Sequence, residues 1–291
     1  MTTLKALRNR KKSVQSTQKI TIAMKMVAGA KLRRAQEHVE EGRPYAHLMN
    51  QILRDLAENA QGLETPHPLL TGTGKTDTHL ILIATSDRGL CGPFNSSILR
   101  ESRKVIELSL SQGQTVKLIS VGRKGKDVLT REYGDLLVES FVDIGHPRLY
   151  FSEAERIADS LLHMFEDGLF DVCTLIYSRF KSAVAQEVTI QQIIPIGKEA
   201  PQPLKAVYEY EPDEDSILRK LLPQNVAVQI YSGLLENAAS EQGARMTAMD
   251  NASRNADDII RNLTLVYNRT RQSQITRELI EIISGAEALK G

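Results

Sequence analysis

The sequence predicts an α/β protein in which a Rossmann-like α/β domain is inserted between two long helices that pair as an antiparallel coiled coil. Three observations indicate this fold. Helix-forming residues dominate both ends of the chain. Short apolar segments alternate with helical segments between them. Apolar residues in both end segments recur at steps of three and four. We expect an N-terminal coiled-coil helix over 1–60, the α/β domain over 75–200, and a foot segment with the C-terminal helix over 208–291.

The overall composition is that of an ordinary globular protein. The chain has 291 residues, of which 41% are hydrophobic and 25% charged, and its net charge of +1 indicates no class of partner. Cys91 and Cys173 are the only cysteines, which excludes a disulfide framework and favours a reducing compartment. Apolar runs such as Leu80–Ala84 are too short to span a bilayer, so we expect no direct membrane insertion.

The N-terminal helix is predicted to begin near Thr2, and Pro44 is expected to kink it. Residues 1–36 hold ten basic residues and no Asp or Glu. A transit peptide or a nucleic-acid-binding coiled coil could use such a segment. The helical pattern nevertheless continues into LRRAQEHVEE, which favours a helix of the mature protein. Its predicted seam is Leu4, Leu7, Lys11, Val14, Gln18, Thr21, Lys25, Ala28, Leu32, Ala35 and Val39.

The middle of the chain has the alternating pattern of an α/β sandwich with a largely parallel sheet. Strands are predicted within 78–87, 115–122, 136–143, 171–178 and 188–196. Helices are predicted around 95–111, 124–132 and 152–166.

The C-terminal region is predicted to form a short helix, Ser216–Leu222, and then a much longer one that starts at Pro223. Residues 240–258 are unusual because Asn, Asp, Ser, Arg and Gln occupy nearly every side of this helix. The predicted seam is Val228, Tyr231, Leu235, Ala238, Gln242, Arg245, Met249, Ala252, Ala256, Ile259, Leu263 and Val266. After a slip it resumes as Ile275, Leu279, Ile282, Ala286 and Leu289.

Two motifs of the middle region suggest chemistry, but neither fits a known site. The segment TGTGKT (71–76) lacks the glycine spacing of a phosphate loop and precedes a strand, whereas a phosphate loop follows one. SDRGLCG follows a strand, where α/β sheets bind ligands, yet it has no dinucleotide fingerprint and no nearby His. We interpret it as a turn that positions the domain. The six histidines have no metal-binding spacing, and no cofactor is expected. An α/β enzyme with helical arms stays an alternative, which predicts a ligand in the middle domain.

Five ordered blocks resemble the gamma subunit of F-type ATP synthases, of the bacterial type. They are VQSTQKITIAMKMVAGAKLRRAQ (14–36) with RPYA (43–46), TSDRGLCGPFN (85–95), YEYEP (208–212), SEQGARMTAMDNASRNA (240–256) and LVYNRTRQSQITRELIEIISGAEAL (265–289). The resemblance covers essentially the whole chain. The plant-type regulatory insertion with its paired cysteines is absent.

The resemblance implies a central rotor shaft that couples proton-driven rotation of the c-ring to ATP synthesis and regulates ATPase activity and proton flow. Three alpha and three beta subunits, the epsilon subunit and the membrane c-ring would be its partners, and no nucleic acid would bind. Catalysis would belong to beta. The implied location is peripheral, on the cytoplasmic face of the bacterial inner membrane. The polar stretch 240–258 would then slide past alpha and beta without adhering to them.

The resemblance also implies roles for particular residues. The segment facing the moving lever of beta matches Met24, Lys25 and Val27. The contacts to a catch loop of beta match Arg271, Gln272 and Thr276. The foot on the c-ring and epsilon matches Tyr208, Tyr210 and Glu211. Residues that would sit in the upper sleeve of the ring are Leu279, Ile282, Ile283, Ala286 and Leu289. From the helix lengths, we expect the second helix to project about ten residues, roughly 15 Å, beyond the first.

Overall fold

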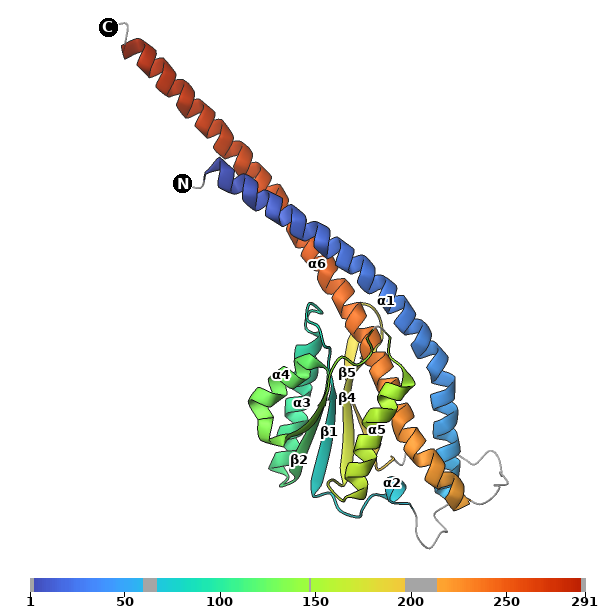
Figure 1. The fold of residues 1–291 in the computed structure, drawn as a ribbon. Helices are drawn as coiled ribbons and strands as arrows, with labels where there is room; N and C mark the ends of the chain where they lie inside the picture. Colours follow the sequence, from blue (N-terminus) through green and yellow to red (C-terminus); the bar gives the residue numbers. More distant parts are fainter. Residues whose placement is uncertain (1–2, 60–66, 147, 197–213, 289–291) are drawn as a thin grey trace. The chain divides into compact units, whose positions relative to one another are not determined.

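Two very long helices begin and end the chain in the computed structural model (Figure 1). Helix α1 spans Leu4–Asn59 and helix α6 spans Glu214–Ala288. The structure describes residues 3–59, 67–146, 148–196 and 214–288. Contacts divide the chain into two compact units. One comprises Met1–Val27 and Met246–Gly291, and the other comprises Ala28–Arg245. Both long helices belong partly to each unit, so the division cuts across the three predicted segments.

The unit Ala28–Arg245 contains a five-stranded sheet in the order β3-β2-β1-β4-β5. The strands are β1 (Thr78–Ala84), β2 (Thr115–Val121), β3 (Leu137–Phe141), β4 (Val172–Phe180) and β5 (Gln186–Ile194). Strands β1 to β4 run parallel, and β5 pairs antiparallel with β4. Each of the five strands overlaps its predicted segment, and β4 and β5 extend beyond theirs by two residues at one end. The predicted Rossmann-like α/β fold between two long helices is confirmed.

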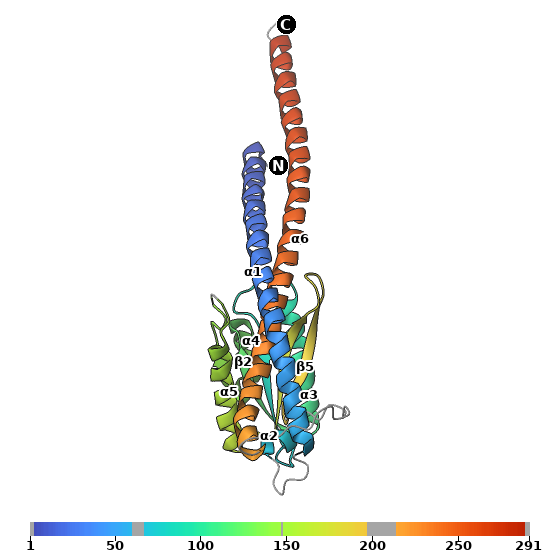
Figure 2. The ribbon, with the colours of Figure 1, turned by 90° about the vertical axis from the view of Figure 1, so that its right-hand side faces the viewer.

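Shorter helices cover the sheet, and Figures 1 and 2 show α3 and α5 on opposite sides of it. They are α2 (Pro68–Thr71), α3 (Phe94–Ser111), α4 (Arg123–Tyr133), α5 (Phe151–Glu166) and a 3-10 turn at Gly134–Leu136. Side chains of β1 and β2 such as Ile81, Ile83 and Leu118 pack with Ile98 and Ile106 of α3 in a closed apolar core. This core fixes where the turn after β1 can lie.

Helix α6 crosses the sheet at close range because glycines remove side chains at the contact. A Cβ atom at Gly233 would meet Leu175 Cδ2 of β4 at 2.6 Å, and one at Gly243 would meet Phe180 at 3.2 Å. Leu175 is fully buried and has no room to withdraw. The helix backbone can therefore approach β4 closely enough for short polar side chains to reach its main chain.

The predicted seam of α1 agrees with the burial of its side chains. From Leu4 to Val39, every predicted seam residue is buried or half-buried. The fully buried residues in this range all belong to that seam: Leu7, Thr21, Ala28, Leu32 and Val39. The polar seam residues Lys11, Gln18 and Lys25 are half-buried.

The prediction of a separate short helix before Pro223 needs correction. Helix α6 is continuous from Glu214 through Pro223, so no separate helix Ser216–Leu222 exists. A proline removes one backbone donor, but Leu218, Leu222 and Val226 form a buried apolar stripe across this point and hold the helix together. Helix α1 also continues through Pro44, and the kink expected there stays a prediction.

The seam of α6 also differs from the prediction beyond Met249. Ile259 and Val266 are 43% and 49% exposed, whereas Ile260, Leu263 and Tyr267 are half-buried. The observed seam is Met249, Ser253, Ala256, Ile260, Leu263, Tyr267 and Thr270. Both seams repeat every seven residues through Met249, Ala256 and Leu263. They differ by one residue at the position between each of these. The polar Ser253 and Tyr267 occupy places that the prediction gave to apolar neighbours.

Candidate functional surfaces of the long helices

Polar contacts join the two helices in the unit formed by Met1–Val27 and Met246–Gly291. Lys25 Nζ lies 2.5 Å from Asp250 Oδ1, and Gln18 donates to Asp257 at 2.5 Å. Arg8 donates to the hydroxyl of Tyr267 at 3.1 Å. As residue numbers rise in α1 they fall in α6, so these contacts run along an antiparallel pair and set its register.

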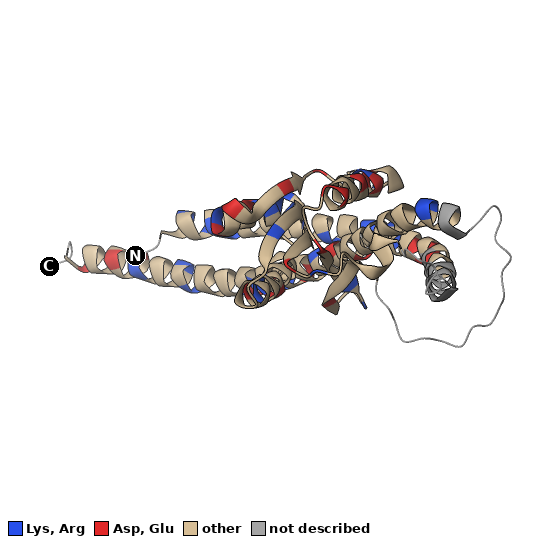
Figure 3. Ribbon diagram, turned by 90° about the horizontal axis from the view of Figure 1, so that it is seen from below, with Lys and Arg blue, Asp and Glu red and all other residues tan. Residues whose placement is uncertain are grey.

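Charge pairing changes the ionisation of these groups. Lys25 donates to Asp250, and Arg254 lies 2.8 Å from its other oxygen, so the pKa of Asp250 falls below its ordinary value. The hydrogen bond from Arg8 lowers the pKa of Tyr267 in the same way. At least one of the ten cations near the N-terminus therefore has an acidic partner within the chain. Figure 3 colours the basic and acidic residues of the described helices; α6 carries both kinds, whereas residues 3–36 carry only basic ones.

The three residues predicted to face the lever of beta are not equivalent. Val27 is 57% exposed, whereas Met24 and Lys25 are half-buried and the ammonium group of Lys25 binds Asp250. Ile20 and Met26 are exposed apolar residues of the same helix that the sequence analysis did not name. Ile20 and Val27 are seven residues apart, which places them on one face of the helix. Apolar residues seven apart on the side away from the seam were the sequence signal for a second apolar face of α1.

The end of α6 carries the predicted catch-loop and sleeve residues. Every residue from Arg271 to Ala288 is exposed, including Gln272, Thr276, Leu279, Ile282, Ile283 and Ala286. The exposed segment is 18 residues long, or roughly 27 Å at 1.5 Å per residue, so the expected ten-residue projection was too short. Leu289 and the foot residues Tyr208, Tyr210 and Glu211 lie outside the described residues.

Within the unit Ala28–Arg245, polar side chains of α6 bind the main chain of β4. The side chain of Asn237 accepts from the Ser178 amide at 3.1 Å, and Ser240 donates to the Ser178 carbonyl at 2.8 Å. Glu236 accepts from the amide of Phe180 at 3.0 Å. Strand β1 pairs with β4 only as far as Ile176, so these side chains continue the hydrogen bonding beyond the paired region. Ser240, the first residue of the unusual polar stretch, therefore faces the chain's own sheet.

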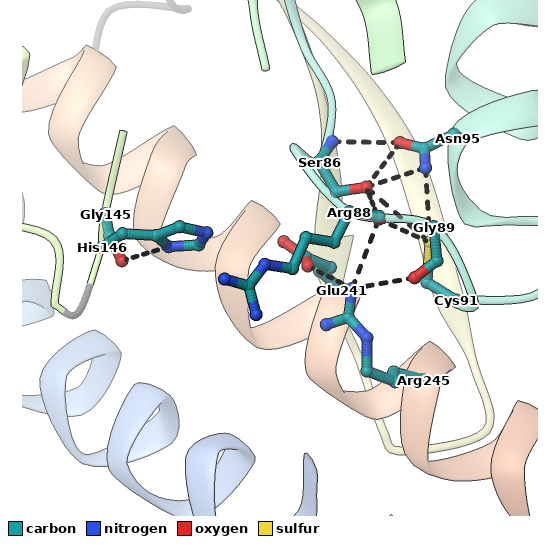
Figure 4. A network of polar contacts seen from close by, with 9 residues as sticks. All are labelled: Ser86, Arg88, Gly89, Cys91, Asn95, Gly145, His146, Glu241 and Arg245. Carbon is teal, nitrogen blue, oxygen red and sulfur yellow. Dashed lines mark hydrogen bonds and ion pairs between the residues drawn. The ribbon is translucent and has the colours of Figure 1, made fainter. Parts of the chain in front are cut away.

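One helical turn further on, Arg245 binds the loop that follows β1 (Figure 4). Its guanidinium donates to the carbonyls of Arg88 and Gly89 at 3.3 Å each and lies 2.7 Å from Glu241. Burial raises the pKa of Glu241, and the Arg245 charge opposes that rise. The SDRGLCG segment thus joins the domain to α6, in agreement with its interpretation as a positioning turn.

Cys91 in that turn is a buried packing residue. Burial raises the pKa of its thiol, while Asn95 donates to its sulfur at 3.3 Å. Ser86 and Asn95 share three further hydrogen bonds beside it. A thiol with a raised pKa is a poor nucleophile at neutral pH. In the part of the chain that the structure describes, no group of three or more His, Cys, Asp and Glu could hold a metal ion.

Known proteins resemble the chain over its whole length. A sequence profile of the family described as ATP synthase matches residues 3–289. The ATP synthase gamma chain of Rhodospirillum rubrum is 53% identical, with 99% of this chain and 100% of that protein covered. The chain belongs to the ATP synthase gamma chain family. The gamma chain of Methylobacterium sp. (strain 4-46) is 58% identical over the same shares of the two chains. The family predicted from the sequence is confirmed.

Solved structures agree with this family. A chain of the central stalk and c-ring of the Tetrahymena thermophila mitochondrial ATP synthase has 32% identity and a TM-score of 0.63, covering 80% of this chain and 99% of that one. A chain of the Euglena gracilis mitochondrial ATP synthase has a TM-score of 0.70, covering 98% of this chain and 94% of that one. Its identity is 20%, so it supports the fold alone. Among the described residues, no helix of this gamma chain family member is long and apolar enough to cross a membrane.

Proposed function

We propose that this chain is the central rotor shaft of an F-type ATP synthase. It couples rotation of the proton-driven c-ring to ATP synthesis at catalytic sites of the alpha and beta subunits, and it carries out no catalysis itself. The full-length match to bacterial gamma chains carries this proposal. The proposed partners are three alpha and three beta subunits, epsilon and the c-ring. The proposed location is the cytoplasmic face of the bacterial inner membrane, as a peripheral protein.

The helical pair has the physical properties that a shaft needs. A paired helix resists bending better than a single one, and the polar seam contacts of Gln18 and Lys25 fix its register. Many of its outward side chains are exposed and polar, such as Arg254, Asn255, Asp257 and Asp258. Such a surface forms contacts that release readily, whereas a large apolar patch would bind one partner persistently.

On this proposal, the exposed face of α1 meets the lever of beta through Val27, with Ile20 and Met26 beside it. Met24 contributes at the edge of that face, and Lys25 acts mainly within the helical pair. Arg271, Gln272 and Thr276 meet the catch loop, and Leu279, Ile282, Ile283, Ala286 and Leu289 sit in the sleeve. Tyr208, Tyr210 and Glu211 form the foot on the c-ring and epsilon.

Co-purification tests the proposal directly. An affinity-tagged chain, expressed in a bacterium whose own gamma gene is deleted, should recover alpha, beta, epsilon and the c-ring and restore ATP synthesis by membrane vesicles. Met24→Lys should lower proton pumping per ATP hydrolysed more than it lowers assembly, because a new cation would pair with acidic groups of beta and resist sliding. Recovery of the chain without alpha and beta, or salt-dependent binding to DNA, would argue against a rotor.

A further inference from the structure

The polar residues of α6 between Glu236 and Arg245 form a directional attachment to the sheet. Glu236, Asn237 and Ser240 are buried, and each binds a main-chain group of β4. Arg245 binds two carbonyls of the turn after β1. Two separate parts of the domain, the end of β4 and the Ser86–Gly92 turn, are therefore held by one stretch of helix.

Close approach of the helix is what makes these contacts possible. Asn and Ser have short side chains, and they reach the β4 main chain only because Gly233 and Gly243 let the α6 backbone lie against Leu175 and Phe180. The glycines cost helix propensity, since glycine is among the poorest helix formers. The two glycines lie at the two places where α6 passes over β4.

Hydrogen bonds resist rotation of a helix about its own axis better than apolar packing does. Apolar contacts are non-directional, so a helix can turn while it keeps much of its buried area. A turn by one residue would move these side chains by about 100°, which follows from 3.6 residues per turn. Asn237, Ser240 and Arg245 would then lose their partners together, and the buried groups of β4 would be left unsatisfied.

We propose that Glu236, Asn237, Ser240 and Arg245 are positioning residues that clamp α6 against twisting, so that the α/β domain carries torque into the helical pair. This inference rests on the proposed rotor function. The compact unit that contains the domain ends on α6 at Arg245, directly after the last of these residues. Beyond Arg245, the same continuous helix belongs to the unit that pairs with the start of α1.

The test compares two buried serines in the same domain. Ser240 Oγ donates to the β4 carbonyl of Ser178, whereas Ser102 Oγ donates to Ile98 within its own helix α3. Asn237→Leu combined with Ser240→Ala removes the two hydrogen bonds to the main chain of Ser178 in β4. Ser102→Ala removes an equally buried hydroxyl whose hydrogen bond lies within α3, and serves as the matched control.

Each variant is assembled into membrane vesicles with the other subunits of the complex. In the Asn237→Leu/Ser240→Ala variant, ATP hydrolysis with an uncoupler present should stay within about twofold of the parent, because the shaft turns without load. The steady proton gradient that ATP hydrolysis builds should fall at least threefold, because the shaft then works against load. Hydrogen exchange of the Ser178 amide should accelerate about tenfold, while that of Leu175 stays unchanged. Ser102→Ala should match the parent in all three measurements.

A second variant, Glu241→Gln with Arg245→Met, releases the turn without leaving a buried charge unpaired. It should lower the gradient in the same load-dependent way. A full gradient despite rapid Ser178 exchange, or an equal loss in Ser102→Ala, would overturn the clamp. Failure of the parent chain itself to assemble with alpha and beta would instead refute the rotor function, so the two ideas fail separately.

Discussion

Asp250 is the residue on which two cations converge, and this makes the helical pair sensitive to acid. Its folded pKa is lowered, so its contribution to stability is present above the ordinary aspartate value of about 3.9 and is lost as the pH falls through the lower folded value. We expect Asp250→Asn to lose stability at neutral pH relative to the parent and to show less further loss below about pH 4. Thermal unfolding followed by circular dichroism between pH 3 and 7 measures this.

Asp258 supplies the control, because it is an exposed aspartate eight positions along the same helix and makes no ion pair among the described residues. Asp258→Asn should leave the pH dependence unchanged. Equal behaviour of the two variants would show that the pairing of Asp250 with Lys25 and Arg254 contributes nothing.

For single residues, the sequence predicted the position on the helix better than it predicted the hydrogen-bond partner. Lys25 lies on the predicted seam, but its bond to Asp250 could not be foreseen because the two residues are far apart in the chain. The same holds for Ser240, which begins the polar stretch 240–258 that was predicted to slide past alpha and beta. Its real partner, like that of the neighbouring Asn237, is the main chain of β4, and main-chain groups leave no signal in the sequence.

Helix α6 offers two glycines whose replacement should have opposite effects. Gly233→Ala would place a Cβ atom 2.6 Å from a buried Leu175 atom, and we expect a loss of about 1–2 kcal/mol once the gain in helix propensity is counted. At Gly285 nothing lies within 4 Å of such an atom, so Gly285→Ala should stabilise the helix by about 0.5–1 kcal/mol. Urea unfolding of both variants decides the matter. Equal changes in the free energy of unfolding would mean that α6 does not pack tightly against β4 at Gly233.

A proline in the paired part of α6 should damage coupling. Ala256 is buried on the observed seam, so Ala256→Pro removes a backbone hydrogen bond and disturbs the packing, at a cost of about 3 kcal/mol or more. We expect assembled complexes to hydrolyse ATP with little proton pumping. Proton pumping at the parent ratio per ATP would contradict the assumption that an unbroken pair transmits the torque.

The elements themselves were largely predictable, because strand and helix periods differ and the middle region switches cleanly between them. The register of α6 against α1 could not be predicted from the sequence. Predicted and observed seams share Met249, Ala256 and Leu263, and only the three-dimensional pairing with α1 selects Ile260 over Ile259. The continuity of α6 across Pro223 was not predicted for a related reason, because it depends on tertiary burial of Leu222 and Val226.

For the whole molecule, the informative change is removal of the last part of α6. Deleting Ser284–Gly291 leaves 271–283 of the exposed segment, with Leu279 and Ile282 still present. We expect a lower yield of assembled complex, because less apolar surface is buried in the sleeve, while the complexes that form retain coupled proton pumping. Yield is measured by subunit recovery and coupling by protons pumped per ATP. Complete loss of pumping in assembled complexes would place torque transmission at the tip.

The pairing of the first and last helices has a consequence for synthesis on the ribosome. Leu7, Thr21 and Ala28 are buried in the folded chain, and Arg8 binds Tyr267. At roughly 5–20 residues per second, α1 emerges on the order of ten seconds or more before its partner helix exists. During that interval its apolar stripe is exposed to solvent, to chaperones and to other nascent chains. We expect the basic, acid-free composition of the first 36 residues to keep such segments apart by mutual repulsion until α6 is synthesised with Asp250 and Asp257.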